Sequence, residues 1–90
     1  MIKTIELLLD EKGMLDGILP VKLNGKTYLI EVEFLLECAA ELSDDRIELH
    51  AHRIMEADFN NDKNTLIYAL QMMAREVLRK NPELLTNAAN

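Results

Sequence analysis

The sequence has few of the residues that disulfide frameworks, phosphate-binding loops and aromatic cores require. It contains one Cys, three Gly and two Pro, and aromatic residues make up only 4% of it, with no Trp. A single Cys excludes an intramolecular disulfide, which is typical of proteins from a reducing compartment. Three Gly leave no glycine-rich loop to cradle a phosphate. The core must therefore be built from Leu, Ile, Val and Met.

Long hydrophobic runs are also missing. No apolar stretch approaches the roughly 20 residues needed to cross a bilayer, and acidic residues at 6, 10 and 11 interrupt the N-terminal apolar run, so no signal peptide is expected. We therefore expect a cytoplasmic protein without membrane contact. The 90 residues are enough for one domain, which we place at residues 1–82, with a frayed tail at 83–90.

The charge of the chain is distributed unevenly. The formal net charge of −6 lies within residues 31–45, whose acidic residues are accompanied by no Lys or Arg. Those residues are Glu31, Glu33, Glu37, Glu41, Asp44 and Asp45. Four acids balance four bases before this segment, and six balance six after it. An acidic segment on an otherwise neutral chain indicates a surface for a basic partner. The pI near 4.8 argues against direct nucleic-acid binding.

The clearest local signal is Asn24-Gly25, which lies between two segments of alternating apolar residues. Asn-Gly supplies both positive-φ positions of a type I′ turn, whose twist matches that of paired strands. A two-residue loop predicts cross-strand pairs that share one apolar face: Leu23 with Lys26, Val21 with Tyr28 and Leu19 with Ile30. We therefore predict a β-hairpin here.

Upstream, Asp10-Glu11-Lys12-Gly13 has Asp first and Gly last, as in a type I turn. It separates residues 2–9 from residues 14–18, which predicts a second hairpin and a three-stranded meander. Residues 2–9 also fit helical spacing. Gly17 and Pro20 indicate a bulge or an edge position in the middle strand.

Residues 33–42 fit both the strand and the helix period, and Glu33, Glu37 and Glu41 form one stripe on a helix. Ala, Leu and Glu favour helix, and a strand continuing from Lys26 would far exceed the usual length of about 5–6 residues. We predict a helix. Its i,i+4 Glu pairs each cost about 0.2–0.5 kcal/mol with no Lys to offset them, and further acids near its C-terminal end oppose the helix dipole. Local stability does not explain the acidic segment.

The remaining chain predicts one more strand and a last helix. Residues 46–55 alternate, with the apolar Ile47, Leu49, Ala51 and Met55 opposite Glu48, His50 and His52. Asp62 or Asn64 can cap the last helix, which stops before Pro82. The order β-β-β-α-β-α gives an α+β fold, an antiparallel sheet of about four strands with helices packed on one face.

The two His and the single Cys are residue types found in metal and catalytic sites, but the sequence lacks the further ligands or base that such sites need. His50 and His52 share one side of the predicted strand, yet catalytic zinc usually needs three protein ligands, and only Glu31 or Glu33 are conceivable as a third. Neighbouring acids should raise the pKa of the Cys38 thiol, the opposite of what a nucleophile needs, so Cys38 is interpreted as a small buried hydrophobe. We expect no metal, no cofactor and no enzymatic activity.

A second contact surface is predicted on the last helix. Helical spacing brings four residues of types that are enriched at interfaces onto one face of this helix. We predict that this face forms a contact with a partner or a homodimer: Tyr68, Met72, Arg75 and Arg79.

These observations predict a small acidic interaction protein, such as an adaptor, inhibitor or chaperone, that presents residues 31–45 to a basic protein surface. Two alternatives stay open. A stripe of carboxylates could mimic nucleic acid and block a DNA- or RNA-binding or host-defence protein, in which case a mobile element is a conceivable source of the mimic. A metal-dependent enzyme could use the pair His50 and His52.

Overall fold

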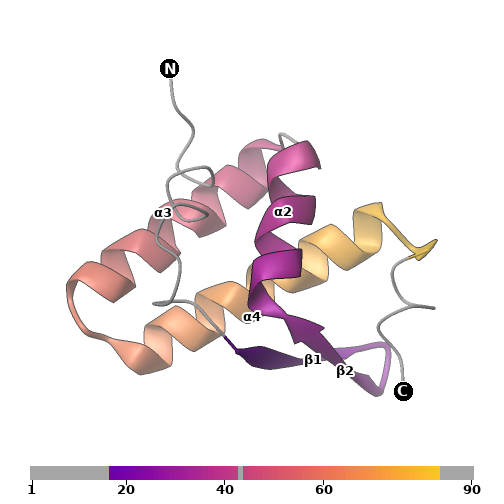
Figure 1. Cartoon of the computed structure of the whole chain (residues 1–90), viewed down its shortest axis with the longest axis horizontal. Helices are drawn as coiled ribbons and strands as arrows, with labels where there is room; N and C mark the ends of the chain where they lie inside the picture. Colours follow the sequence, from indigo (N-terminus) through magenta and orange to yellow (C-terminus); the bar gives the residue numbers. More distant parts are fainter. Residues whose placement is uncertain (1–16, 43, 84–90) are drawn as a thin grey trace.

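The computed structural model describes residues 17–42 and 44–83, in which an antiparallel hairpin is followed by three helices (Figure 1). The strands are β1 (Ile18–Leu23) and β2 (Lys26–Glu31), and the helices are α2 (Val32–Leu42), α3 (Asp45–Phe59) and α4 (Lys63–Lys80). The predicted α+β class is confirmed. The predicted four-stranded sheet is not, because the order over the described residues is β-β-α-α-α. The strand at 2–9 and the turn at 10–13 lie outside the described residues.

The hairpin has the predicted turn and register. Both turn residues have positive φ, 54° at Asn24 and 79° at Gly25, as a type I′ turn requires. The predicted cross-strand pairs are all present: Leu19 with Ile30, Val21 with Tyr28 and Leu23 with Lys26. Apart from Lys26, these residues are buried, while their neighbours in sequence are exposed. One face of the hairpin therefore belongs to the core.

The outer edge of β1 is covered by α4. Gln71 Nε2 donates to the backbone oxygen of Pro20 at 3.0 Å, and Arg75 Nε donates to that of Lys22 at 3.0 Å. Within the described residues only β2 pairs with β1, so Pro20 lies at the edge of this two-stranded sheet, where its missing N–H is tolerated. Over this part of the chain, Pro20 has the predicted edge position.

The prediction of a strand at residues 46–55 is wrong, because this segment belongs to helix α3. Ile47, Ala51 and Ile54 face the core at helical spacing, whereas Leu49, expected inside, is 51% exposed. Apolar residues four apart satisfy both a period of two and a period of 3.6, so alternation over ten residues does not separate the two structures. The Asp44 cap and the packing along α4 select the helix.

Helix α4 packs against α3, β1 and α2, and α3 runs antiparallel to it (Figure 1). Asp62 caps α4, since its Oδ1 accepts from Thr65 N at 3.2 Å and its Oδ2 from Thr65 Oγ1 at 2.6 Å. The helix ends at Lys80 with Asn81 as its C-cap, as predicted from Pro82. The largest fully buried side chains in this core are Val21, Leu35, Ile47, Ile54, Met73, Val77 and Leu78.

Candidate functional site

The outer face of α2 carries an acidic stripe. Glu33, Glu37 and Glu41 are exposed at i,i+4 spacing, and we call these residues the Glu stripe. The helix begins directly after β2, where Val32 N donates to the backbone oxygen of Gly17 at 3.0 Å. Its opposite face is buried and apolar, which fixes the direction in which the Glu stripe points. Helix α2 has no basic residue in its last turn.

Salt bridges within the described part of the chain leave the Glu stripe out. Arg79 pairs with Glu76 at 3.7 Å, and Lys80 Nζ pairs with Asp44 Oδ2 at 2.8 Å. The stripe therefore combines exposure, like charge and the absence of an ion-pair partner among residues 17–42 and 44–83. Such a face attracts basic groups from outside the chain.

The other residues of the predicted acidic surface have different environments. Asp44 is the N-cap of α3 and accepts from Arg46 N at 2.8 Å and Ile47 N at 3.3 Å. The hydrogen bond from Lys80, supported by these backbone donors, lowers the pKa of Asp44. Asp45 lies in the first turn of α3, where the helix dipole favours an acid. The start of α3 therefore explains why both positions are acidic. The sequence had placed these residues only near the C-terminal end of the preceding helix, where the dipole disfavours an acid. Glu31 is exposed at the end of β2.

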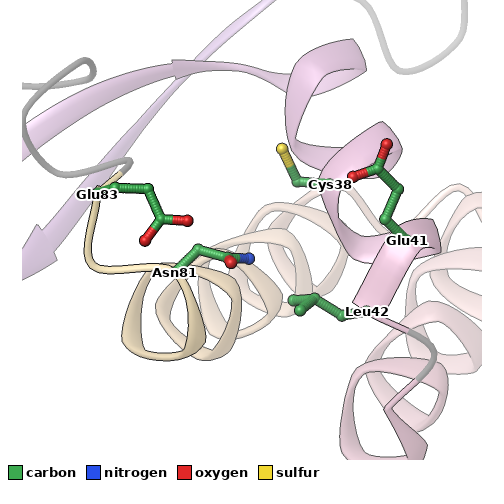
Figure 2. Close-up of a pocket in the computed structure, with 5 residues that line it drawn as sticks. All are labelled: Cys38, Glu41, Leu42, Asn81 and Glu83. Carbon is green, nitrogen blue, oxygen red and sulfur yellow. The ribbon is translucent and has the colours of Figure 1, made fainter.

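A pocket lies beside the last turn of α2, at the Glu41 end of the Glu stripe (Figure 2). Its volume is about 270 Å³, and it is lined by Cys38, Glu41, Leu42, Asn81 and Glu83. Burial, with Glu41 and then Glu37 adding to it, raises the pKa of the Cys38 thiol, in the predicted direction. Cys38 is half-buried rather than fully interior, so its description as a buried small hydrophobe is only partly correct.

The two histidines do not form a pair. On a helix, residues two apart do not face each other, and His50 is buried while His52 is exposed. Burial, assisted by Arg53 and opposed by Glu76, lowers the pKa of His50, and its Nδ1 has no hydrogen-bond partner. The shared side on which the metal alternative depended is therefore absent. Residues 17–42 and 44–83 contain no group of three or more His, Cys, Asp or Glu that could hold a metal ion.

The predicted contact face on α4 is partly used inside the molecule. Arg75 contacts β1 through the carbonyl of Lys22, and its Nη1 also donates to Met72 Sδ at 3.3 Å. Arg79 is paired with Glu76. Tyr68 is 59% exposed. Its role in a contact or homodimer stays a prediction.

Sequence reasoning did not find Asn81 and Glu83 as site residues. They follow α4, some forty residues beyond Cys38, and only the packing of α4 against α2 brings them to the pocket. The sequence shows the charge of Glu83 and predicts that the helix ends at Asn81. Neither observation indicates that these residues lie next to helix α2.

No protein-family model, curated protein or solved structure matches this chain. Among the described helices, none combines the length and the apolar character needed to cross a membrane.

Proposed function

We propose that this protein is a small non-enzymatic interaction protein whose Glu stripe docks on a basic surface of another protein. The observation that carries the proposal is the exposed i,i+4 stripe, which has no ion pair within the described residues. Like-charge pairs at this spacing destabilise a helix. A basic partner would remove that repulsion, so the arrangement favours the bound state.

The spacing of the carboxylates favours a protein partner over mimicry of nucleic acid. Four residues of a helix rise about 6 Å, which sets the distance along the axis between successive carboxylates of the Glu stripe. Double-stranded DNA carries one charge per about 1.7 Å of its axis. Asp44 does not fill the gap, because it caps α3 and pairs with Lys80. Three carboxylates at this spacing suit a few basic side chains of a protein better than a phosphate-binding channel.

The test is affinity capture from a cell extract of the native host, with three forms of the full chain as bait. Glu33→Gln/Glu37→Gln removes two charges from the Glu stripe, and Glu56→Gln/Asp58→Asn removes two from α3 as the matched control. We expect the wild type and the control to capture a basic protein that the stripe variant binds several-fold less. The complex should weaken between about 0.1 M and 1 M salt, as the screening length falls from about 10 Å to 3 Å.

The identified protein is then produced alone and its affinity for the three forms is measured, because capture by itself does not locate the contact. If the partner binds the stripe variant and the control with equal affinity, the Glu stripe is not part of the interface. A captured DNA- or RNA-binding protein that is displaced by its own nucleic acid would support mimicry instead.

A further inference from the structure

The pocket beside the Glu stripe has the dimensions of a side-chain site. Helix α2 supplies Cys38, Glu41 and Leu42, and the segment after α4 supplies Asn81 and Glu83, so the pocket lies between two helix ends (Figure 2). Its volume of about 270 Å³ is below the roughly 300–1,000 Å³ of small-molecule sites. A single long side chain fits this space better than a cofactor does.

The lining has the chemistry of a site for a cation with several donors. Glu41 and Glu83 offer carboxylate oxygens from two different elements, and the Asn81 amide adds an acceptor oxygen. Among the lining residues that the structure describes, none is Lys or Arg. The Cys38 thiol stays protonated because its pKa is raised, so it adds no charge. Leu42 gives the pocket an apolar wall on which an aliphatic stem can lie.

We infer that this pocket binds an arginine side chain of the basic partner. Guanidinium presents five N–H donors in a planar fork and is more weakly hydrated than ammonium, so its donors match a lining that offers acceptor oxygens from two carboxylates and an amide. A lysine ammonium is a compact, strongly hydrated charge with three donors. The inference rests on the proposed function, since it assigns the anchoring residue of the same docking surface.

Glu41 belongs to both the pocket and the Glu stripe, which makes the two sites continuous. An arginine seated in the pocket places the neighbouring part of the partner over Glu37 and Glu33, at intervals of about 6 Å along α2. The pocket then fixes the register of the partner segment, and the Glu stripe contributes less specific attraction.

The test uses acetyl-hexaarginine amide and acetyl-hexalysine amide as probes, titrated into the ¹⁵N-labelled full chain and followed by NMR. Glu41→Gln/Glu83→Gln removes the pocket carboxylates. Glu33→Gln/Glu37→Gln and Glu56→Gln/Asp58→Asn change the charge equally at other places. For hexaarginine we expect shifts at residues 38, 41, 81 and 83, with a Kd about tenfold higher in the pocket variant and about twofold higher in the stripe variant. Hexalysine should not discriminate between these two variants.

Alkylation of the chain's single Cys by N-ethylmaleimide fills the pocket without changing any charge. We expect the adduct to lose hexaarginine binding at the pocket but to retain hexalysine binding. Hexaarginine should in turn slow the alkylation of Cys38, and hexalysine should not. Melting curves recorded for each form confirm that the adduct and the variants are folded.

The possible failures are distinguishable. If the pocket and stripe variants lose equal affinity for hexaarginine, or if the adduct binds it normally, the arginine pocket is overturned while the Glu stripe stands as the docking surface. If neither variant differs from Glu56→Gln/Asp58→Asn with either peptide, the pocket and the proposed function both fail.

Discussion

Helices α2 and α3 follow one another in the chain, yet they use polar residues in different ways. In α2 the charged side chains of the Glu stripe all lie on the outer face, and the buried face is apolar. Helix α3 instead is capped by Asp44, whose carboxylate also binds Lys80, and it carries His50 on its buried face. Polar groups at the start and on the buried face of α3 thus make contacts within the fold, whereas the Glu stripe of α2 is exposed to solvent.

The energies involved explain why both arrangements fold. Burying a Leu contributes about 1.5–3 kcal/mol, and α2 buries Leu35 and Leu36. Repulsion between neighbours of the Glu stripe costs only about 0.2–0.5 kcal/mol per pair. Packing therefore holds α2 in place despite its outer face. An acid at the start of a helix stabilises that helix, so the same charge helps α3.

The largest expected effect in this comparison is that of Asp44→Ala. The substitution removes the cap acceptor of Arg46 N and Ile47 N together with the partner of Lys80. We expect the melting temperature to fall by roughly 4–8 °C at neutral pH, as for the loss of an N-cap in a domain of this size. Thermal unfolding followed by circular dichroism measures it. Asp45→Ala is the control, with a smaller loss because Asp45 acts only through the helix dipole.

Acid provides a second check on Asp44. Because the pKa of Asp44 is lowered from its ordinary value of 3.8, its stabilisation is complete above that value and is lost as the pH falls through the lowered one. The wild type and Asp44→Ala should therefore converge in stability as the pH falls below the lowered pKa of Asp44. A difference that persists in strong acid would mean that the carboxylate charge is not the source of the effect.

The second prediction concerns the buried His50. Its folded pKa is lowered, so below about pH 6.5 the unfolded chain binds a proton that the folded chain excludes, and stability falls. His50→Leu removes this proton linkage and also removes a buried nitrogen without a partner. We expect a gain of about 1 kcal/mol at neutral pH, and a larger gain at pH 5.5. Urea unfolding at both pH values measures the difference.

The control is His52→Gln, which removes an imidazole from the exposed face of the same helix. Arg53 on α3 and Glu76 on α4 are the charged groups that act on His50, in opposite directions. If His50→Leu loses stability in acid as steeply as the wild type, another group is responsible for the linkage.

The hairpin and α3 show what could be predicted from the sequence. At Asn24-Gly25 the turn type and the alternating pattern independently require the same register, and the structure has it. In residues 46–55 only alternation was available. The discriminating residues are Ile54, fully buried although alternation placed it among polar residues, and Leu49, half-exposed although alternation placed it inside. Tertiary packing decided between the two periods.

The candidate site was predictable to a similar extent. The Glu stripe follows from the spacing of three Glu on a predicted helix, and that helix is present. The role of Asp44 depends on a helix beginning at Asp45, which the strand interpretation excluded. The pocket could not be predicted, because Asn81 approaches Cys38 only through the packing of α4 against α2.

The smallest expected effect is that of Glu33→Gln/Glu37→Gln/Glu41→Gln. The substitution removes two i,i+4 repulsions, between 33 and 37 and between 37 and 41, while the exposed face stays polar. We expect the free energy of unfolding to rise by about 0.2–0.5 kcal/mol per pair removed. The helix dipole favours Glu33 in the first turn of α2 and disfavours Glu41 in the last turn, so these two contributions oppose each other. Urea unfolding at low salt measures it. Added salt should stabilise the wild type more than the variant, because only the wild type has repulsion to screen.

This small gain would complete the contrast with Asp44→Ala, since removing acid would stabilise one helix and destabilise the next. It would also show that the Glu stripe is retained against the stability of its own helix, as expected for residues that serve a partner. A clear loss of stability in the triple variant would contradict this interpretation. The three Glu would then be structural residues of α2, and their replacement could no longer isolate binding from folding.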